Sequence, residues 1–260
     1  MVEHKVIVDT SVLLAASLNH VCQEEGNLQI EDNFHKISKP LFEHFEMNID
    51  KEYGIITYEI ELSAKTQIVN AFLKKIAQKN KIHFTTINLN KYSFSLIKIN
   101  EALDRNIRLL TRVPINEREL TEILKKVSNF YGKLSRNIDK LNPQTRINRR
   151  VRSVNFGLRS FERIFATEDE SKNFIIHPKL IDKLKRHPPD LKDYRILAQA
   201  IYIKKRDKSG NTIVSITSTD YHFSKIRLED GSLHDYIPSK IEQTFHIKCD
   251  WPDEILSLIK

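Results

Sequence analysis

The feature that most constrains this chain is a short β-branched run that ends at an acidic residue and leads directly into an apolar helix pattern. Residues 5–8 (KVIV) predict a strand that ends at Asp9. Residues 11–18 (SVLLAASL) have the apolar density of a helix packed beneath a sheet. The chain therefore begins with a strand, an acidic tip and a helix.

The same β-α pattern returns later in the chain. Residues 54–56 predict a second strand, and Thr57 can cap a helix that runs to about residue 80. Towards the C-terminus the pattern predicts a helix over 190–203, strands over 212–217 and 245–249, and a final helix over 251–260. We therefore expect an α/β fold in which a parallel sheet is flanked by helices.

The middle of the chain has a different pattern. Residues 116–165 predict two long amphipathic helices joined at 141–146 (LNPQTR), and the simplest interpretation is an antiparallel α-helical hairpin. We therefore divide the chain into a first α/β part over 1–80, a basic helical insertion over 81–185 and a second α/β part over 186–260.

Positive charge gathers in this middle segment. Residues 104–163 include fifteen Lys and Arg and six Asp and Glu, a net charge of +9, whereas the whole chain carries +8. A solvated helix face usually mixes both signs, but acids are scarce after Glu122. We expect contact with a nucleic acid, because arginine makes bidentate contacts with phosphate. The candidate RNA-binding residues are Arg146, Arg149, Arg150, Arg152, Arg159 and Arg163.

No motif for reading bases is present, so we expect recognition of the backbone and shape of folded RNA. The two cysteines, Cys22 and Cys249, are far apart in sequence and are typical of a reduced cytoplasmic protein without a cysteine-based zinc site. The ten histidines, His222 among them, show no paired metal-ligand spacing and are expected to be surface or packed residues. No stretch is long enough to span a bilayer, so no membrane partner is expected, and a homo-oligomer is left open.

Acidic residues follow two of the predicted strands. Asp9 ends the first strand, and Asp220 follows the strand over 212–217 by a few residues. In an open α/β sheet, ligands bind beyond the carboxyl ends of the strands. A single Asp at such a place is most often a turn or cap residue, but two predicted helices offer further acids near their N-termini. Hydrolysis of a phosphodiester needs a hard dication, and such ions take oxygen ligands.

These motifs resemble those of the PIN-domain nucleases. The resemblance lies in VIVDTSVLL around Asp9, ITYEIEL around Glu61, DYRILAQA around Asp193 and ITSTDYHF around Asp220, and covers about residues 1–80 and 186–260. It implies a PIN-like fold in which these four acids are the catalytic residues and hold Mg²⁺ or Mn²⁺ at the edge of a parallel sheet. The segment of more than a hundred residues between the second and third acids departs from a minimal PIN domain.

The choice between neighbouring acids follows from helix faces. Glu61 shares a face with the buried stripe of its predicted helix, whereas Glu59 does not. Asp193 precedes an apolar stripe, whereas Asp190 follows two prolines and is placed to cap the helix. Ser11 and Ser218 are placed either to hydrogen-bond the metal-binding carboxylates or to act as simple caps.

We therefore expect a metal-dependent endoribonuclease that acts on structured RNA, such as a tRNA or rRNA precursor. Within nucleases, DNA or a foreign RNA in a defence role is the alternative substrate. A non-catalytic RNA-binding or ribosome-assembly factor with a PIN fold is a different class, and a toxin that cleaves cellular RNA is a further alternative. The four acids favour the enzyme, and the length of the insertion argues against a compact toxin.

Overall fold

A computed structural model describes residues 2–18, 32–79, 105–106, 117–144, 150–166, 188–227 and 233–260. Its strands are β1 (Glu3–Val8), β2 (Gly54–Thr57), β3 (Asn142–Gln144), β4 (Thr212–Thr217), β5 (Ile226–Arg227), β6 (Leu233–His234) and β7 (Ile247–Asp250). Its α-helices are α1 (Thr10–Ser17), α3 (Asp32–Met47), α4 (Tyr58–Lys79), α6 (Glu117–Ile138), α7 (Arg150–Ala166), α9 (Leu191–Arg206), α10 (Tyr236–Phe245) and α11 (Pro252–Ile259).

A five-stranded sheet forms the centre of the fold, in the order β3-β2-β1-β4-β7, and every neighbouring pair is parallel. β1 pairs with β4 along its whole length, from Glu3 opposite Thr212 to Val8 opposite Thr217. The chain leaves β1 towards β2 on one side and returns much later as β4 on the other. This arrangement makes a topological switch point between the carboxyl ends of β1 and β4, where α/β sheets bind ligands. The predicted parallel α/β sheet is confirmed.

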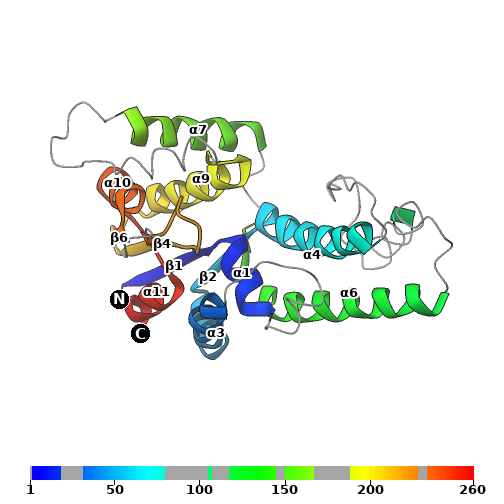
Figure 1. Ribbon diagram of the computed structural model, residues 1–260. Coiled ribbons are helices and arrows are strands. Elements are labelled where there is room, and N and C mark those ends of the chain that lie inside the picture. Colours follow the sequence, from blue (N-terminus) through cyan, green and yellow to red (C-terminus); the bar gives the residue numbers. More distant parts are fainter. Residues whose placement is uncertain are drawn as a thin grey trace.

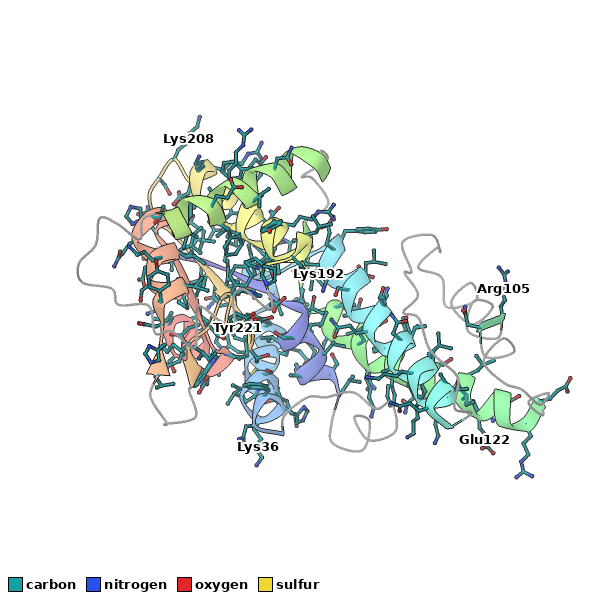
Figure 2. All side chains as sticks on the ribbon, turned by 45° about the horizontal axis from the view of Figure 1, so that its top comes forward. Lys36, Arg105, Glu122, Lys192, Lys208 and Tyr221 are labelled. Atoms are coloured by element: carbon teal, nitrogen blue, oxygen red, sulfur yellow. The ribbon has the colours of Figure 1, made fainter. Side chains whose placement is uncertain are left out.

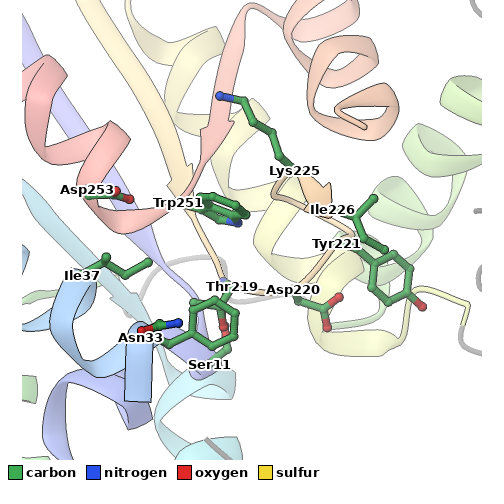
Figure 3. A pocket seen from close by; sticks show the side chains of 11 residues that line it. Ser11, Asn33, Ile37, Thr219, Asp220, Tyr221, Lys225, Ile226, Trp251 and Asp253 are labelled. Carbon is green, nitrogen blue, oxygen red and sulfur yellow. Dashed lines mark hydrogen bonds between the residues drawn. The ribbon is translucent and has the colours of Figure 1, made fainter. Parts of the chain in front are cut away.

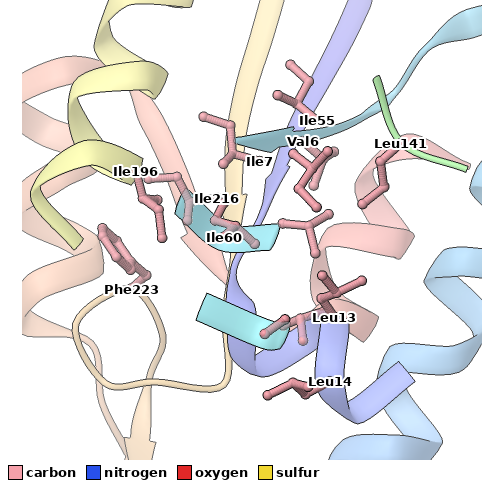
Figure 4. Close-up of a cluster of buried hydrophobic side chains, with 14 of the residues drawn as sticks. Val6, Ile7, Leu13, Leu14, Ile55, Ile60, Leu141, Ile196, Ile216 and Phe223 are labelled. Atoms are coloured by element: carbon pink, nitrogen blue, oxygen red, sulfur yellow. The ribbon is translucent and has the colours of Figure 1, made fainter. Parts of the chain in front are cut away.

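The central strands are buried on both faces, which explains their continuous apolar sequences. Val6, Ile7 and Val8 of β1 are fully buried, and so is Ile216 of β4. Figure 4 shows Ile7 and Ile216 close to Ile196 of α9, while Leu13 of α1 approaches from another side. Helices therefore cover both faces of the sheet.

The helices form two layers around the sheet (Figure 1). α9 and α10 lie on one side and α7 packs on the outside of α9, while α1, α3 and α11 lie on the other side. α4 and α6 pack against each other and extend away from the sheet. Within the described residues, no helix combines the length and the apolar character needed to cross a membrane.

The prediction of an antiparallel helical hairpin in the middle segment is wrong for the described residues. α6 packs against α1 and α4, whereas α7 packs against α9 and α10, and the strand β3 between them joins the edge of the sheet beside β2. The physical reason is burial: Phe130 and Leu134 of α6, Leu141 before β3 and Phe161 of α7 all enter one hydrophobic core that they share with the α/β strands. The two apolar stripes therefore face the α/β core and not each other.

The contact between α7 and α9 is close enough to depend on a glycine. A Cβ atom at Gly157 of α7 would overlap the backbone carbonyl of Tyr194 in α9, and backbone cannot move aside as a flexible side chain can. Only glycine at this position lets the two helices approach as they do.

We predict that Gly157→Ala lowers the free energy of unfolding by about 1 to 3 kcal/mol, because the added methyl group forces α7 away from α9. Gly132→Ala is the matched control, since Gly132 is also inside a helix but a Cβ atom there would meet no other atom within 4 Å. It should raise stability by about 0.5 to 1 kcal/mol through the ordinary preference of a helix for alanine. Urea denaturation of both variants measures the difference, and equal effects would show that α7 does not pack this closely.

Candidate carboxylate site

Asp9 lies at the carboxyl end of β1 and is the N-cap of α1. Its Oδ1 accepts a hydrogen bond from the Thr10 amide at 2.6 Å, and its Oδ2 accepts from the hydroxyls of Ser11 and Ser218, each at 2.8 Å. The prediction that these two serines could bind a site carboxylate is confirmed for Asp9. Asp9 is 7% exposed, and these three hydrogen bonds hold its carboxylate in one orientation.

The loop after β4 is tied to the same group of atoms. The Thr219 amide donates to Ser11 Oγ at 3.2 Å, and the Asp220 amide donates to Ser218 Oγ at 2.9 Å. The Asp9 amide in turn donates to the Thr217 carbonyl at 3.0 Å. These bonds connect segments about 210 residues apart in sequence, as the Ser218 to Asp9 separation of 209 shows, and they hold Asp220 beside Asp9.

Asp193 approaches from the first turn of α9. Asp190 caps this helix as predicted, because its side chain accepts from the Lys192 and Asp193 amides. Asp193 completes a capping box, since its Oδ2 accepts from the Asp190 amide at 2.7 Å. The carboxylate of Asp193 is 13% exposed, whereas that of Asp190 is 54% exposed. Asp193 is therefore the less exposed acid of the pair, which fits the sequence-based choice between them.

His222 lies between two of these acids. Its Nδ1 is 3.2 Å from Asp220 Oδ1 and 3.4 Å from Asp193 Oδ2, and the residue is 4% exposed. Sequence reasoning placed the histidines at the surface or in packing positions and assigned no site role to His222. Its position two residues after Asp220, in the turn that follows β4, was the sequence feature that could have indicated a place in the site.

Burial and mutual repulsion raise the pKa values of two of the acids. Burial is the main cause that raises the pKa of Asp9, and the negative charge of Asp220 adds to it against the hydrogen bonds from Ser218 and Ser11. Burial likewise raises the pKa of Asp193 to about 7, with His222 opposing the shift and Asp9 adding to it. Three aspartates from distant segments therefore act on one another at the switch point. Such raised pKa values are common where a functional site needs a cation.

Glu61, the fourth predicted acid, has a different partner. It pairs with Lys65 one helical turn later in α4, and Lys65 is itself buried. Glu59 forms an ion pair with Arg195 of α9 at 2.8 Å and so links the first turns of α4 and α9. The main charges that act on Asp9 and Asp193 come from neither glutamate. The structure thus brings Asp9, Asp193 and Asp220 together and leaves Glu61 paired with a lysine.

The described carboxylates are not arranged as a complete set of metal ligands. Over the described parts of the chain, no three His, Cys, Asp or Glu side chains already have positions that suit one metal ion. The ligand type nevertheless fits Mg²⁺ or Mn²⁺, which take carboxylate oxygens. Catalytic geometry often tightens only when the ligand is present, so side-chain movement towards an ion is the expected step.

The predicted RNA-binding arginines are only partly within the described residues. Arg146 and Arg149 lie outside them. Arg150, Arg152, Arg159 and Arg163 lie on α7, where the side chain of Arg159 is exposed. Figure 2 shows Tyr221, the neighbour of Asp220, near the centre of the molecule and Glu122 at the outer end of α6. Of the two basic helices, α7 is the one that packs on α9, the helix that carries Asp193.

We predict that Asp193→Asn stabilises the metal-free protein at pH 8 by on the order of 1 to 3 kcal/mol. The pKa of Asp193 is raised from 3.8 to about 7 in the folded protein. Above pH 7 the side chain is ionised in both the folded and the unfolded protein, and its ionisation then lowers the free energy of unfolding. This cost falls as the pH drops from 7 towards 4, because the folded protein then binds the proton. Urea denaturation in EDTA at pH 8 and pH 5 should show the gain shrinking at the lower pH.

Asp190→Asn is the matched control, because it changes the exposed acid of the same capping box. It should show no comparable gain at pH 8. A gain for Asp193→Asn that is the same at both pH values would contradict the assignment of Asp193 as a desolvated carboxylate with a raised pKa.

Comparisons of this chain with protein-family models, with curated proteins and with solved structures each found no match. The resemblance to PIN-domain nucleases therefore rests on the sequence motifs around Asp9, Glu61, Asp193 and Asp220.

Proposed function

We propose that this protein is a PIN-type endoribonuclease that uses Mg²⁺ or Mn²⁺ to hydrolyse phosphodiester bonds in structured RNA, such as a tRNA or rRNA precursor. One observation carries the proposal. Asp9, Asp193 and Asp220 converge from three distant segments, and their mutual repulsion contributes to the raised pKa values of Asp9 and Asp193. Like charges gathered beside a switch point cost stability, and a divalent cation that binds RNA phosphate would offset that cost.

The donor set supports a hard cation. Asp9, Asp193 and Asp220 would hold the ion, and Glu61 would join them by exchanging Lys65 for it. A bound ion would activate water and neutralise charge on the phosphate. In the balanced reaction, the oxygen of water bonds to phosphorus, the bond from phosphorus to the leaving sugar oxygen breaks, and that oxygen gains a proton.

The residues around the acids would keep them in position during this reaction. Ser11 and Ser218 donate to the same oxygen of Asp9, so this carboxylate cannot rotate without losing both bonds. His222 lies within 3.4 Å of both Asp193 and Asp220, so a single ring constrains two acids that come from different segments. Such supporting contacts orient the ligands of metal sites.

The basic middle segment would bind the RNA. Its helix α7 packs directly on α9, with Gly157 against Tyr194, the neighbour of Asp193. RNA held by the arginines of α7 would therefore lie on the same side of the sheet as the helix that carries a catalytic acid. Contacts to phosphate bring affinity without base recognition, which suits a folded RNA.

A second candidate function is supported by one specific observation. Glu61 is paired with Lys65, and a lysine held beside a metal ligand would compete with the ion. This pairing favours a non-catalytic RNA-binding or ribosome-assembly factor that keeps the fold and three of the acids. The two functions differ in whether RNA is cleaved.

We predict that the purified protein cleaves RNA in Mn²⁺ or Mg²⁺ and that EDTA abolishes cleavage, because carboxylate ligands need the ion to act. Asp9→Asn, Asp193→Asn and Asp220→Asn should each lower the rate by about a hundredfold or more while circular dichroism shows an intact fold. Asp190→Asn, which removes an exposed acid beside the site, should retain activity. Wild-type rates in any two of the three site variants would refute the enzyme.

The two glutamates separate the candidate functions further. Glu61→Gln should lower the rate more than Glu59→Gln, because Glu59 is engaged by Arg195 in a link between helices. The reverse ranking would exclude Glu61 as a ligand. Metal-independent RNA binding without cleavage would favour the assembly factor.

We predict that charge reversal of Arg149, Arg150 and Arg152 together weakens RNA binding and makes it less dependent on salt, because fewer counterions are released when fewer phosphates are contacted. The slope of log affinity against log salt should decrease by about three if each arginine contacts one phosphate. Cleavage of a short substrate at saturating concentration should be retained. Binding at several salt concentrations measures both quantities.

Charge reversal of Lys51, Arg206 and Lys208 together is the matched control, because these three basic residues are exposed and lie outside the middle segment. It should leave the salt slope close to that of the wild-type protein. An unchanged affinity and slope in the arginine variant would show that the segment does not bind the RNA.

A further inference from the structure

A pocket opens beside the carboxylate site, at the carboxyl ends of β4 and β7. Its volume is about 770 Å³, and its walls come from α1, α3, the turn after β4 and the start of α11. Proteins usually bind small molecules in pockets of roughly 300 to 1,000 Å³. The lining residues include Ser11, Phe34, Asp220, Tyr221, Lys225 and Trp251. The proposed cleavage reaction so far uses only Ser11 and Asp220 from this set.

The walls combine flat aromatic rings with hydrogen-bonding groups. Phe34, Tyr221 and Trp251 contribute rings, while Asn33 and Lys225 contribute an amide and an ammonium group. In the view of Figure 3, Trp251 and Thr219 lie at the centre, between Asp220 on one side and the α3 residues on the other. An inorganic ion would make no use of the aromatic rings, and a purely apolar ligand would make no use of the amide and ammonium groups. A planar heterocycle with polar edges satisfies both kinds of wall.

One buried acid organises two of the wall residues. Asp250 is 5% exposed; its Oδ2 is 3.0 Å from Lys225 Nζ, and its Oδ1 accepts from the Trp251 amide at 2.9 Å. The hydrogen bond that Lys225 donates to Asp250 raises the pKa of Lys225, so this side chain stays charged at neutral pH. The backbone at Trp251 and the ammonium group of Lys225 are thus held in place before a ligand arrives, and such preorganisation lowers the entropic cost of binding.

The position of the pocket relates it to the proposed reaction. Asp220 lines the pocket and also contacts His222 at the carboxylate site, and Ser11 lines the pocket and also donates to Asp9. A group bound in the pocket would therefore adjoin whatever is held at the carboxylates. In a nucleic acid, the group adjoining a phosphate is a nucleoside.

We propose that this pocket binds one unpaired nucleobase of the RNA, next to the phosphodiester held at the carboxylate site. The inference rests on the proposed nuclease function and deepens it, because it names the kind of nucleotide at the cut. A base inside a helix is stacked and paired and cannot enter such a pocket, whereas a base in a loop, bulge or end can stack on aromatic side chains. The substrate is then an unpaired nucleotide in a folded RNA, and α7 binds the neighbouring backbone.

The chain contains one tryptophan, Trp251, so its fluorescence reports on this pocket directly. We would titrate the full-length protein in EDTA with adenosine and uridine monophosphates, and with ribose 5-phosphate as the probe without a base. Saturable quenching by at least one nucleotide and none by ribose 5-phosphate is the expected result. Equal responses to all three would overturn the proposal, because the pocket would then recognise only sugar and phosphate.

A wall variant tests where the base binds. Phe34→Ala keeps the reporter but removes a ring, and it should weaken nucleotide binding by about tenfold or more, the usual loss when one stacking side chain is removed. Phe156→Ala is the matched control, since Phe156 is an exposed phenylalanine on α7 outside the pocket. Equal affinities for the two variants would overturn the assignment of this pocket.

A comparison of RNA forms tests the requirement for an unpaired base. A short single-stranded RNA should quench Trp251 more strongly than a blunt duplex of the same sequence, and equal quenching would overturn that requirement. The same measurements separate this inference from the proposed function. Saturable quenching without any cleavage would support the pocket and reject the nuclease, while metal-dependent cleavage without quenching by any nucleotide would do the reverse. Asp193→Asn should lose cleavage but still bind nucleotide, because Asp193 does not line the pocket.

Discussion

Parallel pairing of β1 with β4 brings the two ends of the sequence together at the centre of the sheet. It joins the first strand of the chain to one that begins more than two hundred residues later, in register from Glu3 opposite Thr212 to Val8 opposite Thr217. This register puts Asp9 and the turn that carries Asp220 at the same edge of the sheet. The hydrogen bonds of Ser11 and Ser218 to Asp9 then follow from strand pairing and not from local sequence. A shift of one residue would point the buried β1 side chains away from their present neighbours and separate the two acids.

Desolvation and repulsion between the aspartates of the carboxylate site lower the stability of the folded protein. Asp9 is buried and Asp193 is largely shielded from solvent, and the pKa of each is raised mainly by this loss of solvation, with repulsion from neighbouring aspartates adding to it. The apolar core supplies the offsetting free energy, since the three β1 residues before Asp9 are fully buried. A site that costs stability without its ligand is the arrangement expected where the acids serve binding or catalysis rather than folding.

The described helices of the middle segment pack onto the α/β part and do not form a separate subdomain. α6 and α7 share the core of the α/β part, and α7 packs on α9 with Gly157 against Tyr194. This contact connects the most arginine-rich helix to the residue beside Asp193. In the proposed nuclease, α7 would bind RNA beside α9, the helix that carries Asp193. The pocket at Trp251 would add selectivity for an unpaired nucleotide.

Strand propensity and helix caps act over a few residues, so the sequence by itself predicted the strands that end at Val8 and Thr217 and the capping of α4 by Thr57 and of α9 by Asp190. Only the tertiary structure decided that α6 and α7 pack on different helices, that Lys65 pairs with Glu61, and that His222 lies between two acids. An amphipathic stripe specifies that a face is buried but not against what, and a side-chain contact across distant segments depends on the sheet order. That order follows from long-range burial, which no local pattern encodes.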